Sequence, residues 1–354
     1  MNKTKLLVLL LGLIPLSAFS QRAFISNHYI YDMFLMNPAD AGSNRKCYVL
    51  GGMYNQQWIG TDLAPTTQLL SFQAYMPKNT GSGTYIYNDR NGNNNRVGLQ
   101  QSISVDVILR ENRKGFTSIA FGLSALVEQA SLRTSNFIGD GIDIDPVITG
   151  GNHNGVGFNM NAGLILKIDQ YKIGASVTNL LPNNNPFFQN DEEAEIKPYT
   201  HAFASSVYKY PGRELYLEPI VYFRHYSNND SRLDVNLKAQ LPTMSEDFSF
   251  WGLIGYRRSM DQKAGKDLGI AATIGFLYKG INLGFEHEYG LTGAQSHYGS
   301  YMKLILGYKF CQSGKHKAIP CSAAGLSGIG SGELHRRNNT KNTKPKARTV
   351  QRKR

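Results

Sequence analysis

VGLQQSISVDVILRENRKGFTSIAFGLSALVEQA, residues 97–130, contains two alternating runs separated by a short turn-like stretch. In the first run the odd-numbered positions are mainly Val, Leu and Ile, whereas the even-numbered positions include Gln100, Ser102 and Asp106. Because neighbouring side chains of a strand point to opposite faces, this pattern predicts a sheet with one apolar face and one polar face. Each run also has the length that a tilted strand needs to cross a bilayer.

The same alternation recurs along most of the chain, and the connections between the alternating segments differ in length. Those at 77–96, 131–154 and 182–200 are long, and most of the others are short. Bacterial outer-membrane barrels combine short periplasmic turns with longer extracellular loops. We therefore predict an all-β fold, a transmembrane antiparallel outer-membrane β-barrel. Its thirteen clearest candidate strands are 46–58, 66–76, 97–109, 116–130, 155–168, 171–181, 201–210, 214–226, 232–241, 247–258, 268–278, 281–289 and 300–310.

The number of strands follows from where the two ends of the chain must lie. With both ends on the periplasmic side, one more crossing is needed before Cys47, and residues 28–36 supply the candidate. The prediction is thus a barrel of about 14 strands, an even number as in other bacterial barrels. Residues 37–42 would then form a turn at the outer rim, and Trp58 would lie at the periplasmic end of its strand. The alternative is that residues 21–45 fill the lumen as a plug and that the barrel has about 12 strands.

The first twenty residues have the features of a secretory signal peptide. Two lysines precede an apolar stretch too short to span a bilayer, and the small residues Ala18 and Ser20 come before a cleavage position at Gln21. Beyond this position no run approaches the roughly 18 apolar residues of a transmembrane helix. The predicted organisation is a signal peptide at 1–20, an outer-membrane β-barrel at 21–310 and a flexible basic tail at 311–354, with both mature termini in the periplasm.

The formal net charge of +12 is concentrated at the C-terminus. Residues 311–354 carry eleven Lys or Arg and one Glu, so the predicted barrel is close to neutral. Since a signal peptide directs the chain away from nucleic acid, we expect no nucleic-acid partner. The tail should instead contact an anionic surface, such as an acidic periplasmic protein, peptidoglycan carboxylates or lipid headgroups. Its expected contact residues are Arg336, Arg337, Lys341, Lys344, Lys346, Arg348, Arg352, Lys353 and Arg354.

Residues typical of catalysis or metal binding show no recognisable arrangement. Cys311 and Cys321 could pair outside the cytoplasm, and Cys47 reads as a small buried apolar residue of a strand. His316 between the two later cysteines makes only a loosely spaced set of metal ligands. GDGIDIDP at 139–146 invites a calcium reading, although acidic surface loops are common. We predict no catalytic residue, no cofactor and no metal, and no enzymatic activity.

Two motifs near the N-terminus, MNPADAG at 36–42 and YNQQWIGTDLAPTTQLLSF at 54–72, resemble the PorP/SprF family. Members share an Asn-Pro-Ala-x-Ala-Gly turn, a strand that ends in Arg/Asn-x-Gln-Trp, and a Pro-Thr pair that opens the next strand. Asn55 stands where Arg is common in the family, and the resemblance extends over residues 21–310. The matching positions are Asn37, Pro38, Ala39, Ala41, Gly42, Tyr54, Asn55, Gln57, Trp58, Pro65 and Thr66.

The resemblance implies an outer-membrane component of the type IX secretion system, a route that in some bacteria is linked to gliding motility. The implied partners are a large secreted adhesin or its C-terminal sorting domain, periplasmic or outer-membrane components of the system, and outer-membrane lipids. The role would be to support export and surface retention of the adhesin, or to dock to apparatus proteins. The rival hypothesis is a diffusion channel for small solutes, which rests on barrel architecture alone.

The long loops are the candidate surfaces for contact with a secreted partner. Aromatic residues are favoured at the centres of interfaces, and four of them fall in the predicted loops 77–96 and 182–200. The alternative is that the loops merely cap the barrel. The four aromatic residues are Tyr85, Tyr87, Phe187 and Phe188.

Overall fold

The computed structural model describes residues 27–43, 47–61, 63–112, 115–133, 153–181, 197–211, 215–226, 230–242, 248–260, 267–292, 296 and 301–311. The described chain begins with three short 3-10 helices, η1 (Asn27–Ile30), η2 (Met33–Leu35) and η3 (Pro38–Asp40). The strands that follow are β1 (Cys47–Gln56), β2 (Thr66–Met76), β3 (Thr80–Asn91), β4 (Asn94–Asn112), β5 (Gly115–Leu132), β6 (His153–Ile168), β7 (Tyr171–Thr178), β8 (Tyr199–Ser206), β9 (Tyr208–Lys209), β10 (Tyr216–Tyr226), β11 (Asp230–Pro242), β12 (Phe248–Ser259), β13 (Asp267–Tyr278), β14 (Ile281–Gly290) and β15 (Tyr301–Cys311).

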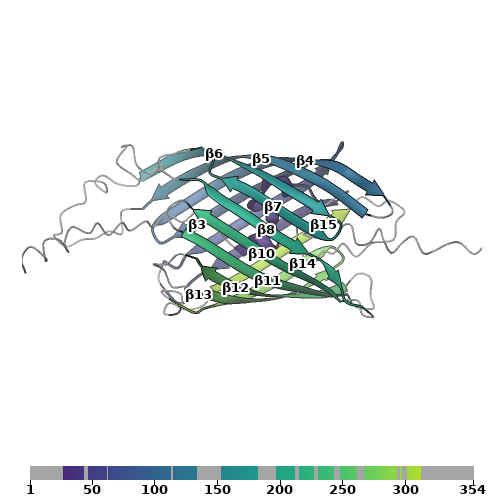
Figure 1. The fold of residues 1–354 in the computed structure, drawn as a ribbon. Coiled ribbons are helices and arrows are strands. Elements are labelled where there is room, and N and C mark those ends of the chain that lie inside the picture. Colours follow the sequence, from purple (N-terminus) through teal and green to yellow (C-terminus); the bar gives the residue numbers. More distant parts are fainter. Residues whose placement is uncertain are drawn as a thin grey trace, which may run out of the picture.

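The strands form one closed antiparallel barrel (Figure 1). Each strand pairs with its neighbours along the chain, and β15 pairs with β1 to close the ring. The two-residue strand β9 continues β8 after a break at Val207, and both pair with β10. The described strands therefore make a barrel of fourteen strands, the predicted number. Among the described residues, no helix is long and apolar enough to cross a membrane.

The two faces of the barrel wall differ in chemistry. Outward positions carry exposed apolar side chains, including Leu70, Ile103 and Ile274. Inward positions carry buried polar side chains, including Gln100 and Ser124. An apolar outer band around a polar interior is the arrangement that a lipid bilayer requires of a spanning barrel. The alternation read from the sequence is thus the alternation between lipid and lumen.

The two ends of the barrel can be told apart by their connections. At one end, called the short-turn end, lie the tight turns 77–79, 169–170 and 279–280, and Cys47 is the register partner of Cys311 there. The longer connections 133–152 and 179–198 lie at the opposite, long-loop end. Because β1 starts at the short-turn end, Trp58 follows it at the long-loop end. Trp58 and the end of the last strand are both predicted to be periplasmic, and because they lie at opposite ends of the barrel the two predictions cannot both be right.

Residues 28–36 are not a barrel strand. All nine are buried, whereas a wall strand alternates between lumen and lipid, and they fold as η1 and η2 inside the barrel. The missing strand is β3, which lies within the stretch predicted as loop 77–96 and places Tyr85 and Tyr87 on the inner wall. The predicted loop position of these two tyrosines is wrong. The alternative of a plug is correct for the described part of residues 21–45, whereas its count of twelve strands is wrong.

The sequence predicted Cys47 as a small buried apolar residue, but it is not a free cysteine. It is disulfide-bonded. The register of the β1–β15 pair places the backbone of Cys311 directly opposite it, at the seam where the barrel closes. Cys321 lies outside the described residues, as do His316, the acidic stretch 139–146 and the predicted signal peptide at 1–20.

Candidate functional site in the barrel lumen

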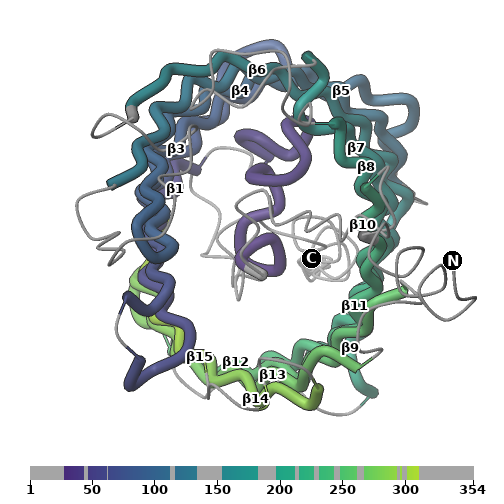
Figure 2. The backbone as a smooth tube through the Cα atoms, turned by 90° about the vertical axis from the view of Figure 1, so that its left-hand side faces the viewer, coloured from purple at the N-terminus to yellow at the C-terminus, as the bar shows by residue number. Residues whose placement is uncertain are grey.

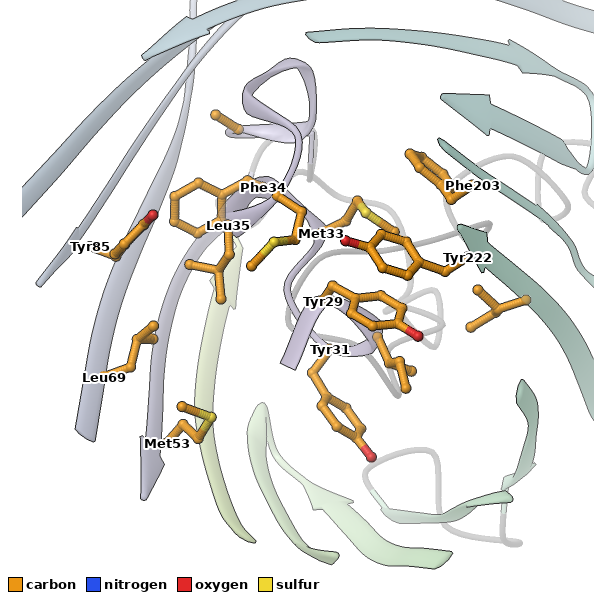
Figure 3. Close-up of a cluster of buried hydrophobic side chains, with 14 of the residues drawn as sticks. Tyr29, Tyr31, Met33, Phe34, Leu35, Met53, Leu69, Tyr85, Phe203 and Tyr222 are labelled. Carbon is orange, nitrogen blue, oxygen red and sulfur yellow. The ribbon is translucent and has the colours of Figure 1, made fainter. Parts of the chain in front are cut away.

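The interior of the barrel holds a segment of its own chain. We call residues 28–43 the lumenal segment, and every residue from 28 to 42 is buried. Figure 2 shows it as the purple coil inside the ring of strands. Its apolar side chains join inward-facing wall residues in one hydrophobic cluster, in which Phe34 lies against Tyr85 and Tyr29 lies against Tyr222 (Figure 3).

The Asn-Pro-Ala-Asp-Ala-Gly motif forms the turn that contains η3. The Ala39 backbone N–H donates a 3.0 Å hydrogen bond to Asn37 Oδ1, so Asn37 caps η3, and Pro38 occupies its first position. Gly42 follows with a φ of +61°, a conformation that glycine adopts without steric cost. The prediction of a turn at residues 37–42 is confirmed. Its predicted place at the outer rim is wrong, because the turn lies in the lumen.

The wall beneath this turn is a line of small residues. Successive register partners across β3 to β7 are Gly81, Ser104, Gly122, Gly163 and Ser176, which we call the small-residue row. A Cβ atom at Gly122 would collide with the backbone of Pro38 and Ala39. One at Gly163 would collide with Asn37, and one at Gly81 with the Ala41 carbonyl. Because these three glycines have no side chains, the turn can approach the backbone of the wall.

The serines of the row bind the backbone of the segment. Ser104 Oγ donates a 2.6 Å hydrogen bond to the Ala41 carbonyl, and Ser176 Oγ donates one of 2.7 Å to the Met36 carbonyl. The Gly42 N–H donates to Gln73 Oε1 at 3.0 Å. These contacts satisfy main-chain groups that would otherwise be buried without partners. All three contacts fix the path of the segment's backbone.

Asn37 and Asp40 add side-chain contacts to the same surface. The Asn37 amide donates to the carbonyls of Leu164 and Ala175 at 3.2 and 3.1 Å. Asp40 forms a buried ion pair with Lys172, whose Nζ lies 2.5 Å from Asp40 Oδ1. Removal of one partner from a buried pair leaves an uncompensated charge, so this contact ties the segment to β7 in one position.

The N-terminal half of the segment meets the opposite wall through two tyrosines. Tyr29 stacks on the ring of Tyr222 and donates its hydroxyl to Asp234 Oδ2 at 2.7 Å. The Tyr31 hydroxyl donates to Glu286 Oε2 at 3.0 Å. The acceptors belong to a set of inward charges that we call the charged wall cluster: Arg232, Asp234, Arg257, Glu286 and Lys303. Within it Lys303 lies 2.9 Å from Glu286, and Arg232 lies 2.6 Å from Asp234.

Two ionisable residues of the segment are shifted by burial in opposite directions. Burial lowers the pKa of His28 to about 3, and the positive charge of Lys303 adds to this effect. Burial raises the pKa of Asp32 well above its ordinary value, against the opposing effect of its hydrogen bond from Ser71 at 3.0 Å. Gln73 Nε2 also donates to Asp32, at 2.8 Å. Both shifts predict that docking of the segment depends on pH.

Part of the second motif shapes the β1–β2 hairpin, whereas Asn55, Leu69 and Ser71 of the same stretch are buried on the inner wall. The Gln57 N–H donates to the Pro65 carbonyl at 2.9 Å, which closes the loop where Thr66 opens β2. Trp58 has a φ of +52°, and Thr61 donates to its carbonyl. Tyr54 is exposed on the outer face of β1. The structure thus separates the predicted motif residues into a lumenal set, 37–42, and a hairpin set, 54–66.

The four aromatic residues predicted as partner anchors do not form one surface. Tyr85 and Tyr87 are buried on β3, and Tyr85 donates to Gln100 Oε1 at 2.8 Å. Phe187 and Phe188 lie outside the described residues. So do the basic residues of the tail from Arg336 to Arg354.

The inner contacts of the segment were not foreseen from the sequence. They include the hydrogen bonds of Tyr29 and Tyr31 to the charged wall cluster and the ion pair of Lys172 with Asp40. A usable signal was present, because Glu286 and Lys303 occupy polar positions of strongly alternating strands, where a charge must face the lumen. In the described residues no group of three or more His, Cys, Asp or Glu could hold a metal ion. The arrangement is suited to hold a peptide.

Comparison with known proteins gives a family and a set of similar barrels. The family model described as type IX secretion system membrane protein PorP/SprF matches residues 18–308. Among solved structures, the TodX deltaS2S3 mutant monoaromatic hydrocarbon channel and a Pseudomonas aeruginosa FadL homologue are each 10% identical with a TM-score of 0.48, covering 78% of this chain and 93% of theirs. The Ralstonia pickettii toluene transporter TbuX is 10% identical with a TM-score of 0.47, over 78% and 92%. Among curated proteins, none matches the chain.

Proposed function

Because the chain belongs to the PorP/SprF family of type IX secretion system membrane proteins, we propose that this outer-membrane secretion component supports the export and surface retention of a large secreted adhesin. Docking to periplasmic apparatus proteins is part of the same proposal, as is a link to gliding motility in bacteria that glide. The observation that carries the proposal is the family match over residues 18–308.

One feature of the barrel supports this role over a diffusion channel for small solutes, and a second supports its place in the outer membrane. The described lumen contains the buried lumenal segment, whereas a diffusion pore needs an open aqueous path. The apolar outer wall suits an integral protein of the outer membrane. We further propose that the short-turn end faces the periplasm, which would place both mature termini beside the periplasmic apparatus.

Deletion of the protein in its native bacterium tests the proposal. We expect loss of the adhesin from the cell surface, measured by antibody binding to intact cells, while uptake of small hydrophilic solutes stays at the level of the parent strain. The chain supplied from a plasmid should restore surface display. The opposite result, normal display with impaired solute uptake, would replace the secretion role with the channel.

A further inference from the structure

The barrel wall is complete without the lumenal segment. β1 pairs with both β2 and β15, so the ring closes with no strand from residues 28–43. Within the described residues, backbone hydrogen bonds of the segment run inside it, as from Asn37 N to the Met33 carbonyl and from Asp40 N to the Asn37 carbonyl. The segment therefore contributes nothing to the strand pairing that holds the wall together.

The segment is held as a bound peptide is held. Wall side chains donate to its backbone carbonyls, as Ser104 does to Ala41 and Ser176 does to Met36. Glycines of the wall admit its turn, and inward apolar residues, among them Met53 and Leu69, belong to the cluster that packs its apolar side chains. A polar site with fixed donors and an apolar floor is the usual composition of a ligand site.

The wall behind the segment is suited to contact water. Its inward positions include Gln100, Ser102, Ser124 and Asn161, whose polar groups water can satisfy. A polar interior of this kind lines the aqueous channels of larger barrels. Removal of the segment from a fourteen-stranded wall would leave a hydrated passage along the barrel axis.

We infer that the lumenal segment is a separable peptide ligand that seals the barrel. With the segment docked on the small-residue row, the barrel does not conduct ions, and without it the barrel is an open pore. The same site takes up the segment's sequence when it is supplied as a separate peptide. The inference goes beyond the secretion role, since it concerns permeability and holds whichever partners the protein has.

Conductance across planar lipid bilayers tests the seal. The purified full-length chain should give few or no openings, and a variant that lacks residues 28–42 should give stable ion-conducting openings. A synthetic peptide of residues 27–43, added to the deleted variant, should block these openings. The matched control peptide carries Asn37→Ala and Gly42→Val, which removes the cap of η3 and adds a Cβ branch where Gly42 lies against the Ala74 carbonyl. This control peptide should not block.

A second variant keeps the whole chain and disturbs only the docking surface. Gly122→Val places a side chain where the backbone of Pro38 and Ala39 lies, so the segment should leave the row and the barrel should conduct. Gly52→Val is the matched control, because Gly52 is on the outer face of β1 and a Cβ there meets ordinary contacts at 3.6 Å or more. It should remain closed.

Barrel formation is checked in each case by the heat-dependent migration of folded barrels in gels. Closed barrels for both the deletion and Gly122→Val would overturn the inference, provided that both proteins are folded. Equal block by the native and the control peptide would overturn the recognition site while leaving the seal in place. Neither result depends on adhesin export, so failure here is distinguishable from failure of the proposed function.

Discussion

Gly42 combines two demands that sequence alone does not separate. Its φ of +61° lies in the left-handed region, and a Cβ there would also collide with the Ala74 carbonyl on β2. Gly92, in the turn between β3 and β4, has the same φ of +61° with no neighbour within 4 Å of its missing Cβ. Comparison of Gly42 with Gly92 therefore separates the effect of contact with the wall from the effect of backbone conformation.

A strained backbone conformation costs about 1–3 kcal/mol. We expect Gly42→Ala to weaken docking of the lumenal segment by more than this amount. Gly92→Ala should carry the conformational cost alone and leave docking unchanged. The measurement is cleavage by chymotrypsin after Tyr29, Tyr31 or Phe34, followed by mass spectrometry, since these bonds are buried while the segment is docked. Equal protection of the segment in the two variants would contradict the role assigned to close packing at Gly42.

We expect His28 and Asp32 to give docking a pH optimum. The pKa of docked His28 is lowered from 6.5 to about 3, so the undocked form takes up a proton that the docked form refuses, and docking weakens as pH falls below about 6.5. The pKa of docked Asp32 is raised, so docking weakens in the other direction, as pH rises through that raised pKa. Chymotrypsin cleavage of the segment, corrected for the activity of the protease, should be slowest at intermediate pH.

Matched variants assign the two arms of that profile. His28→Asn should remove the weakening on the acid side and leave the other side intact. Asp32→Asn should remove the weakening at higher pH, because the amide stays neutral and keeps the oxygen that accepts from Ser71 or Gln73. An unchanged profile in both variants would show that other groups control docking.

At the level of elements, the errors of prediction have one cause. Residues 28–36 are predicted as a strand because one more crossing is needed before Cys47, yet burial on every side removes the alternation that distinguishes a wall strand. β3 read as a loop because Gly81 and Gly83 break its inward pattern, and these glycines are needed where Ala41 and Phe34 press against the wall. The two errors are thus linked, because the segment packs against the glycines of β3 and those glycines make β3 look like a loop.

The β1–β15 seam carries a prediction of its own. Cys47 is disulfide-bonded and faces Cys311 in the register, so we expect Cys311 to be its partner. Cys47→Ser should lower the stability of the barrel by about 2–4 kcal/mol, the usual effect of removing a native disulfide. Thermal unfolding followed by gel migration measures this loss, and Cys321→Ser serves as the control with unchanged stability. A non-reduced digest that links Cys47 to Cys321 would contradict the assignment.

For the whole molecule, the class of fold and the number of strands were predictable from lipid-facing alternation and from the rule of even numbers. The count of fourteen survived because one strand wrongly assigned to residues 28–36 replaced the overlooked strand β3. What lay beyond the sequence was register. Only register brings the residues of the small-residue row into one line, and only register sets Glu286 beside Lys303. The lumenal site depends on both alignments.

The long reach of the lumenal tyrosines has a consequence for biogenesis. Tyr29 binds Asp234, 205 residues further along the chain, and Tyr31 binds Glu286, 255 residues further along. Contacts of such separation form late, because the intervening chain must be ordered first. The lumenal segment can therefore complete these contacts only after β11 and β14 have been placed. The barrel therefore assembles around the lumenal segment, and the pairing of β15 with β1 completes the ring that encloses it.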